Sequence, residues 1–129
     1  MFERLFGQSA APVLEQATAF HAARHALLAE NIVNISTPGY LQKDLDASAF
    51  RSELRRRLEK RDRFTAGALD VELEGVGTDD ALVFHDGNNR SVEHLMSEHA
   101  KNALQHNLAI ELLRKQHMLF DLALRERIA

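Results

Sequence analysis

The chain has 129 residues, of which 45% are hydrophobic but only 6% aromatic, and its formal net charge is −3 at pH 7. That small charge argues against long-range attraction to nucleic acid or to an anionic membrane, and the absence of cysteine excludes disulfides and thiolate chemistry. Without tryptophan, and with a single tyrosine, the composition favours a thin helical assembly over a compact domain with a thick core.

The N-terminal segment 1–13 reads MFERLFGQSAAPV. It lacks the basic region and uninterrupted apolar stretch that a cleaved secretory signal requires. No stretch of the chain is apolar over the length that a membrane span needs. We therefore expect neither a cleaved signal peptide nor a transmembrane helix.

The first predicted element is an amphipathic helix over Val13–Ile35. Its apolar residues recur near one face at the 3.6-residue period: Val13, Leu14, Ala17, Phe20, Leu27, Leu28 and Ile35. The helix must end before Pro38, because the residue that precedes a proline is pushed out of the helical region. Pro38 and Gly39 suit the two central positions of a type II turn, in which glycine supplies the positive φ.

Two asparagines, Asn31 and Asn34, stand in the last turns of this helix. Short amide side chains can bond the carbonyls that a helix C-terminus leaves unpaired, or the backbone of a neighbouring chain. These residues therefore indicate a capped helix end followed by a sharp change of direction.

The middle region mixes weak helix and strand signals. A narrow apolar stripe predicts a short helix over 47–62, formed by Ala47, Phe50, Leu54 and Leu58. Residues 65–89 contain no lysine or arginine, and the alternating run Leu69–Glu74 predicts a strand with one buried face. Leu82–Phe84 is a second strand candidate, so this region would hold a short helix and a β-hairpin.

A long helix is predicted for the C-terminal segment 91–129. The turn residues Asp86, Gly87, Asn88 and Asn89 lead into it, Ser91 is its expected N-cap, and Glu93 is well placed for the helix dipole. A heptad seam can be written through two columns, Met96, Ala103, Ile110, His117 and Leu124, alternating with His99, His106, Leu113 and Phe120. A second apolar set lies off that seam: Leu104, Leu108, Leu112, Met118, Leu119 and Leu122.

These patterns predict a mainly α fold in which the long N- and C-terminal helices form an antiparallel, coiled-coil-like pair. One partner helix covers only one face of a helix that is apolar on two. The second face therefore needs other subunits, in an open helical polymer or in a four-helix-bundle homodimer. Contacts that build the pair or join subunits are expected from Leu27, Leu28, Leu108, Ile110, Leu112, Leu113, Leu119 and Phe120.

The expected organisation has three parts. Residues 1–40 form the N-terminal helix with its turn, residues 41–90 a partly irregular middle region, and residues 91–129 the C-terminal helix.

The end of the first helix resembles a known family. A helix that carries Asn31, Ile32 and Asn34, followed by Thr37, Pro38, Gly39 and Tyr40, is similar to the N-terminal signature of the axial proteins of the bacterial flagellum. The short chain, the run Asp86–Asn89 before the last helix, and Lys43–Asp46 after the turn resemble the FlgB family of proximal-rod proteins. With the terminal helix, the resemblance covers most of the chain outside its acidic middle.

The resemblance implies a structural, non-enzymatic subunit that polymerises through its terminal helices into the flagellar basal-body rod. Its partners would be copies of itself, other rod proteins, the adaptor that joins the rod to the membrane ring, and the flagellar type III export apparatus. Rod proteins are exported without a cleaved signal, so the implied location is the basal body, across the periplasm. No nucleic acid, small-molecule substrate, cofactor or metal is expected.

The residues leave open an alternative from another class, a soluble helical-bundle adaptor or homodimer without a flagellar role. A metal-binding module is a further alternative, because His21 and His25 are four residues apart on one helix. They lack the glutamate of the HExxH motif, which argues against zinc hydrolase chemistry. No nucleophile elbow, phosphate-binding glycine loop or suitable carboxylate pair indicates an enzyme.

Two charged patterns give weaker predictions. The arginine-rich run 51–63 alternates with acids, which favours a solvated helix face over a phosphate-binding surface. His99, His106 and His117 lie at or near the predicted seam, where protonation of an imidazole would disturb packing.

Overall fold

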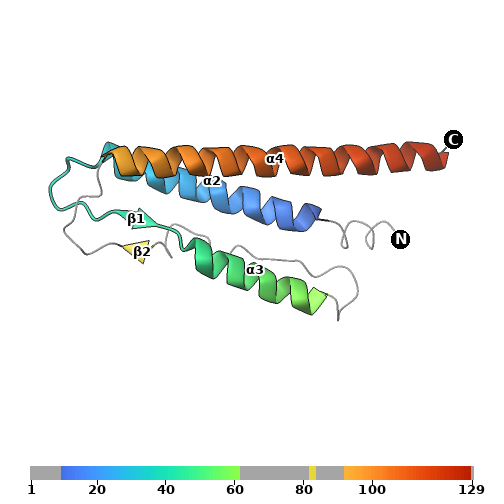
Figure 1. The fold of residues 1–129 in the computed structure, drawn as a ribbon, viewed down its shortest axis with the longest axis horizontal. Helices are drawn as coiled ribbons and strands as arrows, with labels where there is room; N and C mark the ends of the chain where they lie inside the picture. The colour runs from blue at the N-terminus through green and yellow to red at the C-terminus, as the bar shows by residue number, and fades with distance from the viewer. Residues whose placement is uncertain (1–9, 62–81, 84–91, 129) are drawn as a thin grey trace.

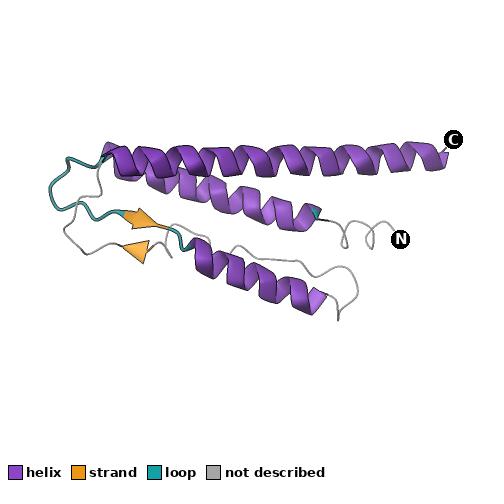
Figure 2. Cartoon of the chain, viewed as in Figure 1, coloured by secondary structure: helices purple, strands orange, loops and turns teal. Residues whose placement is uncertain are grey.

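A computed structural model describes residues 10–61, 82–83 and 92–128. Its elements are α2 (Ala11–Val33), β1 (Lys43–Asp44), α3 (Ala47–Arg61), β2 (Leu82–Val83) and α4 (Val92–Ile128). In Figure 1, α2 lies between α4 on one side and β1 with α3 on the other. The fold is mainly helical, as predicted, and the described strands are two short arrows in Figure 2.

The helices α2 and α4 form the predicted antiparallel pair. His21 of α2 contacts Asn102 of α4, whereas His25, one turn later, contacts His99, which comes earlier in α4. At 1.5 Å per residue, the 37 residues of α4 extend about 55 Å and the 23 residues of α2 about 35 Å. The C-terminal part of α4 therefore projects beyond α2 (Figure 1).

The helix α2 begins and ends two residues earlier than predicted, at Ala11 and Val33. Pro12 is accepted in the first turn, where a backbone N–H has no partner inside the helix. Asn34 leaves the helical conformation, with φ −96° and ψ 11°, and its Nδ2 donates to the Glu30 carbonyl at 2.9 Å. The predicted capping amide is thus present at Asn34, and Ile35 lies outside the helix.

The core lies between α2 and the segment that follows the turn. Phe20, Leu27 and Leu45 are buried together, and the Phe50 ring of α3 stacks on Phe20 with ring centroids 4.2 Å apart. Burial of each such side chain stabilises the fold by about 1.5–3 kcal/mol. This contact holds α3 against the face of α2 that α4 does not cover.

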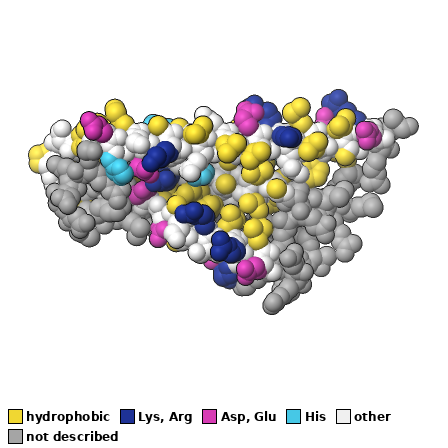
Figure 3. Space-filling model, viewed as in Figure 1, with side chains coloured by type: hydrophobic (Ala, Val, Ile, Leu, Met, Phe, Trp, Pro, Cys, Tyr) yellow, Lys and Arg dark blue, Asp and Glu magenta, His cyan; other side chains and the backbone are white. Residues whose placement is uncertain are grey.

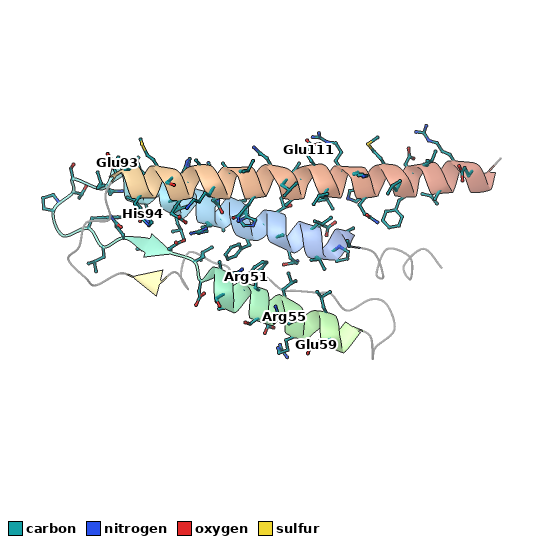
Figure 4. The ribbon with its side chains drawn as sticks, viewed as in Figure 1. Arg51, Arg55, Glu59, Glu93, His94 and Glu111 are labelled. Atoms are coloured by element: carbon teal, nitrogen blue, oxygen red, sulfur yellow. The ribbon has the colours of Figure 1, made fainter. Side chains whose placement is uncertain are left out.

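The predicted short helix is confirmed as α3. Asp46 caps it, because its Oδ1 accepts the N–H groups of Ser48 and Ala49 at 2.9 and 3.0 Å. Arg51, Arg55 and Glu59 follow one another along α3 and are exposed (Figure 4). The described part of the arginine-rich run is therefore a solvated helix face.

The strands pair over a long separation in sequence. β2 confirms the strand candidate at Leu82, but it pairs antiparallel with β1, Lys43 opposite Val83 and Asp44 opposite Leu82, and not within a local hairpin. The predicted strand Leu69–Glu74 lies outside the described residues, and so do the predicted turn and cap residues Asp86, Gly87, Asn88, Asn89 and Ser91.

One column of the predicted α4 seam is wrong by one residue. Towards α2, α4 buries Leu95, Asn102 and Ala109, with exposed fractions of 1%, 0% and 6%, whereas Met96 is 55% exposed. The rest of the predicted column is half-buried at Ala103 and Ile110 and exposed at His117 and Leu124. The other column, His99, His106, Leu113 and Phe120, is half-buried as expected of a seam.

The polar residue Asn102 explains this error. A prediction based on apolar residues does not place an asparagine in the core. Asn102 is nevertheless buried, because its Nδ2 donates to the His21 carbonyl at 2.8 Å and so satisfies the amide.

Candidate assembly site

The turn after α2 has the predicted type II geometry. The Tyr40 N–H donates to the Thr37 carbonyl at 3.2 Å, and Gly39 has φ +74°. Thr37, Pro38 and Gly39 are exposed, and a Cβ on Gly39 would meet no atom within 4 Å. Gly39 is therefore required by the backbone conformation and not by lack of space.

Asn31 ties the chain that leaves this turn back to α2. Its Nδ2 donates to the Lys43 carbonyl at 2.6 Å, and its Oδ1 accepts the Lys43 N–H at 3.0 Å. The Tyr40 hydroxyl donates to the same Oδ1 at 3.2 Å, and Asn31 is only 2% exposed. The side chain thus pairs with Lys43 much as a neighbouring strand would, and it bonds backbone of its own chain.

The Tyr40 hydroxyl is well suited to this donor role. Burial, and then the nearby Glu30 carboxylate, raise the pKa of Tyr40 above its ordinary value of 10.0. The hydroxyl therefore keeps its proton throughout the neutral range.

An ion-pair network that the sequence reasoning missed joins the same region to α4. Arg24 of α2 donates to both oxygens of Asp44 in β1, from Nε at 2.9 Å and from a terminal nitrogen at 3.1 Å. That terminal nitrogen also donates to Glu98 of α4 at 3.2 Å. The hydrogen bond to Asp44 is the main reason that the pKa of Arg24 is raised. One feature of the sequence could have indicated this network: Arg24 is the only lysine or arginine in α2.

The helix α4 carries an exposed apolar strip. We call it the outer strip, and its members are 44–72% exposed: Leu104, Leu108, Leu112, Met118, Leu119 and Leu122. At 100° per residue, Leu104, Met118 and Leu122 lie opposite Leu95, Asn102 and Ala109, whereas Leu108, Leu112 and Leu119 lie towards one side of α4. Glu111, which lies among them in sequence, points away from α2 in Figure 4.

Charged side chains are interspersed with hydrophobic side chains along α4, as Figure 3 shows. The described residues that line a groove of about 410 Å³ near the end of α4 are Lys115, Met118, Leu119, Asp121, Leu122 and Arg125. A large set of exposed apolar side chains on one helix is typical of a surface that packs against another protein.

The structure separates the predicted packing residues into three groups. Leu27 and Leu28 are buried within the chain, at 2% and 1% exposure, and so are unavailable at its surface. Ile110, Leu113 and Phe120 are half-buried on the side of α4 near α2. Leu108, Leu112 and Leu119 belong to the exposed outer strip. Ile32, from the turn signature, is half-buried.

The histidines are arranged for packing. His21 bonds Asn102 and the His25 ring lies against that of His99, and among the described residues no group of three metal-ligating side chains is found. Within the same residues, no helix is both long enough and apolar enough to cross a membrane.

Comparison with known proteins identified no relative: neither a protein family, nor a curated protein, nor a solved structure matches this chain.

Proposed function

We propose that this chain is a structural subunit of the bacterial flagellar basal-body rod, most similar to the proximal-rod proteins of the FlgB family. In this proposal it polymerises through its terminal helices and has no catalytic activity. Its neighbours are copies of itself, other rod proteins and the adaptor to the membrane ring, and it reaches the periplasm through the flagellar type III export apparatus.

The observation that carries the proposal is the exposed outer strip on α4. Six large apolar side chains along α4 are at least 44% exposed, and α2 packs only against the N-terminal part of this helix (Figure 1). An uncovered strip of this kind favours aggregation unless another subunit packs on it. Packing that does not close into a ring produces a helical filament, which suits a rod.

The turn signature supports the same proposal. Asn31, Pro38, Gly39 and Tyr40 carry the resemblance to axial proteins, and they form one connected unit at the end of α2. That unit returns the chain along α2, so β1 and α3 pack on the side away from α4 (Figure 1). The outer face of α4 is thereby left free of them for other subunits.

The same strip also fits the second candidate, a helical adaptor that forms a homodimer. Two α2–α4 pairs could bury their outer strips against each other in a four-helix bundle. The two candidates differ in the number of chains per assembly. A four-helix bundle contains two chains, whereas a rod grows by the addition of further subunits.

Deletion of the gene in its source bacterium tests the proposal. Electron microscopy of purified basal bodies should show membrane rings without a rod, and the wild-type gene should restore the rod. Complete rods and normal swimming in the deletion strain would contradict the proposal and favour the adaptor.

Complementation with variants tests the surface itself. Leu108→Glu places a charge in the outer strip and should fail to restore rods, although the chain accumulates normally. The matched control is Asn107→Glu, because Asn107 is the adjacent residue and is already exposed and polar. Rod assembly by Leu108→Glu at the level of Asn107→Glu would show that the outer strip is not the assembly surface.

A further inference from the structure

A histidine cluster lies where α2 packs against α4, apart from the turn and the outer strip. The rings of His25 on α2 and His99 on α4 lie with centroids 4.0 Å apart and planes inclined by 32°. His21 Nδ1 lies 2.8 Å from Asn102 Oδ1, one turn away. The proposed function uses none of these imidazoles.

His21 keeps its hydrogen bond in either charge state. Asn102 Nδ2 donates to the His21 carbonyl at 2.8 Å, so Asn102 Oδ1 is left to accept a proton from His21 Nδ1. A neutral imidazole protonated on Nδ1 and an imidazolium both offer that proton. Protonation of His21 therefore leaves this contact intact, and the sensitive contact is the pair of facing rings.

The charged residues next to the two histidines in sequence, Arg24 and Glu98, are already paired. Arg24 on α2 donates to both oxygens of Asp44 on β1 at 2.9 and 3.1 Å, and to Glu98 on α4 at 3.2 Å. The other oxygen of Glu98 accepts from Lys101 at 3.0 Å. These two cations and two carboxylates balance, and every carboxylate oxygen among them already accepts a hydrogen bond.

We propose that the contact between His25 and His99 is proton-sensitive: it holds α2 against α4 at neutral pH and weakens when both rings are protonated in mild acid. Neutral rings pack favourably at this distance, whereas two imidazolium charges 4.0 Å apart repel each other. The ion-pair network of Arg24, Asp44, Glu98 and Lys101 is itself neutral, so it brings no net negative charge to balance the added charges. The inference does not depend on a flagellar function.

The electrostatic environment of His99 gives the direction of the effect. Burial, and then the neighbouring His25, lower the pKa of His99 below its ordinary value of 6.5. The unfolded chain therefore binds this proton more readily than the native chain does. Stability is unaffected well above pH 6.5 and falls as the pH drops from 6.5 through the lowered pKa.

Thermal unfolding of the full chain at pH 7.5 and pH 5.5, at constant ionic strength, tests the proposal. We expect the Tm of the wild type to be about 3–6 °C lower at pH 5.5. His99→Phe keeps an aromatic ring that cannot be protonated, and should lose less than half as much. The matched control is His106→Phe, because His106 is a half-buried histidine one heptad later in the same column, and its Tm should fall as in the wild type.

Equal losses of Tm in the wild type and His99→Phe would overturn the proposal. Should His99→Phe not fold, NMR titration of the imidazole Cε1–H signals in the wild-type chain decides the question. The proposal requires His99 to titrate below 6.5 and to move up towards that value in His25→Phe. A His99 that titrates at its ordinary value in the wild type would refute it.

Discussion

Asn31 supplies by its side chain the hydrogen bonds that a neighbouring strand would supply by its backbone. Its amide satisfies both the N–H and the carbonyl of Lys43, and it also accepts the Tyr40 hydroxyl. Asn31→Ala would leave these groups without a partner in a site that excludes water. We expect it to lower the free energy of unfolding by about 2–3 kcal/mol, measured by urea denaturation.

Asn34→Ala is the matched control for this substitution. Asn34 is less buried: its Nδ2 donates to the Glu30 carbonyl at 2.9 Å, and its Oδ1 accepts the Thr37 hydroxyl at 3.2 Å. Its loss should cost less than about 1 kcal/mol, because the Glu30 carbonyl still accepts the backbone N–H of residue 34 and both lost bonds are exposed to water. An equal cost for both substitutions would show that the pairing with Lys43 adds no special stability.

Gly39 is required for its backbone conformation and not for close packing. Nothing lies within 4 Å of a Cβ at this position, so Gly39→Ala introduces no clash, but the φ of +74° is strained for alanine. We expect a loss of about 1 kcal/mol in urea denaturation, and a smaller loss for Gly39→Asn, because asparagine tolerates positive φ. An alanine variant as stable as the wild type would mean that the turn can change its type without cost.

At the scale of elements, Arg24 connects α2 to both of its neighbours. Its guanidinium joins Asp44 in β1 and Glu98 in α4, and the side chains of Arg24 and Asp44 are only 13% and 11% exposed. Arg24→Ala leaves a nearly buried carboxylate unpaired and should lower the free energy of unfolding by about 2–4 kcal/mol. Arg24→Lys should recover part of this loss, because lysine keeps the charge but not the bidentate geometry.

The pair Arg114–Glu111 provides the comparison within α4. Both of its side chains are 63% exposed, so water screens their attraction. Arg114→Ala should change the stability by no more than about 0.5 kcal/mol in the same experiment. A comparable loss for Arg24→Ala and Arg114→Ala would contradict the importance of the buried network.

The elements differ in how well their sequence predicts them. Apolar periodicity was sufficient to predict all three described helices, because each one carries apolar residues that recur with the helical period. Pro38 and Gly39 were also sufficient to predict the type II turn, since only one common turn type suits both residues. These features depend on residues close together in the chain.

The errors and omissions involve polar residues that find partners far away in sequence. Asn102 occupies the seam because His21, 81 residues earlier, satisfies its amide. Arg24 reaches Glu98 across 74 residues. A prediction from apolar periodicity treats such residues as solvent-exposed. It therefore placed one column of the seam one residue too late and missed the ion pairs. The pairing of β1 with β2 is long-range in the same way.

At the scale of the whole molecule, α2 is covered on both sides whereas α4 is covered on one. The core around Phe20 and Leu27 occupies one side of α2, and α4 occupies the other (Figure 1). On α4, the residues near α2 are buried or half-buried, whereas the outer strip remains exposed. Association with another chain should therefore involve α4 more than α2.

This asymmetry predicts separate effects on folding and on association. Leu119→Glu combined with Leu122→Glu changes two side chains that are 52% and 55% exposed in the single chain. We expect it to abolish self-association in sedimentation velocity. The α2–α4 pair should keep its stability to within about 1 kcal/mol, because the changed side chains point to solvent.

Ala123→Glu is the control, because Ala123 is an exposed neighbour that lies off the outer strip, and this variant should associate as the wild type does. The size of the wild-type species then separates the two candidate functions. A species that grows with concentration indicates an open interface and supports the rod subunit, whereas a species that stops at two chains supports the homodimer. If the double variant associates as strongly as Ala123→Glu does, the contact between chains lies elsewhere than on the C-terminal half of α4.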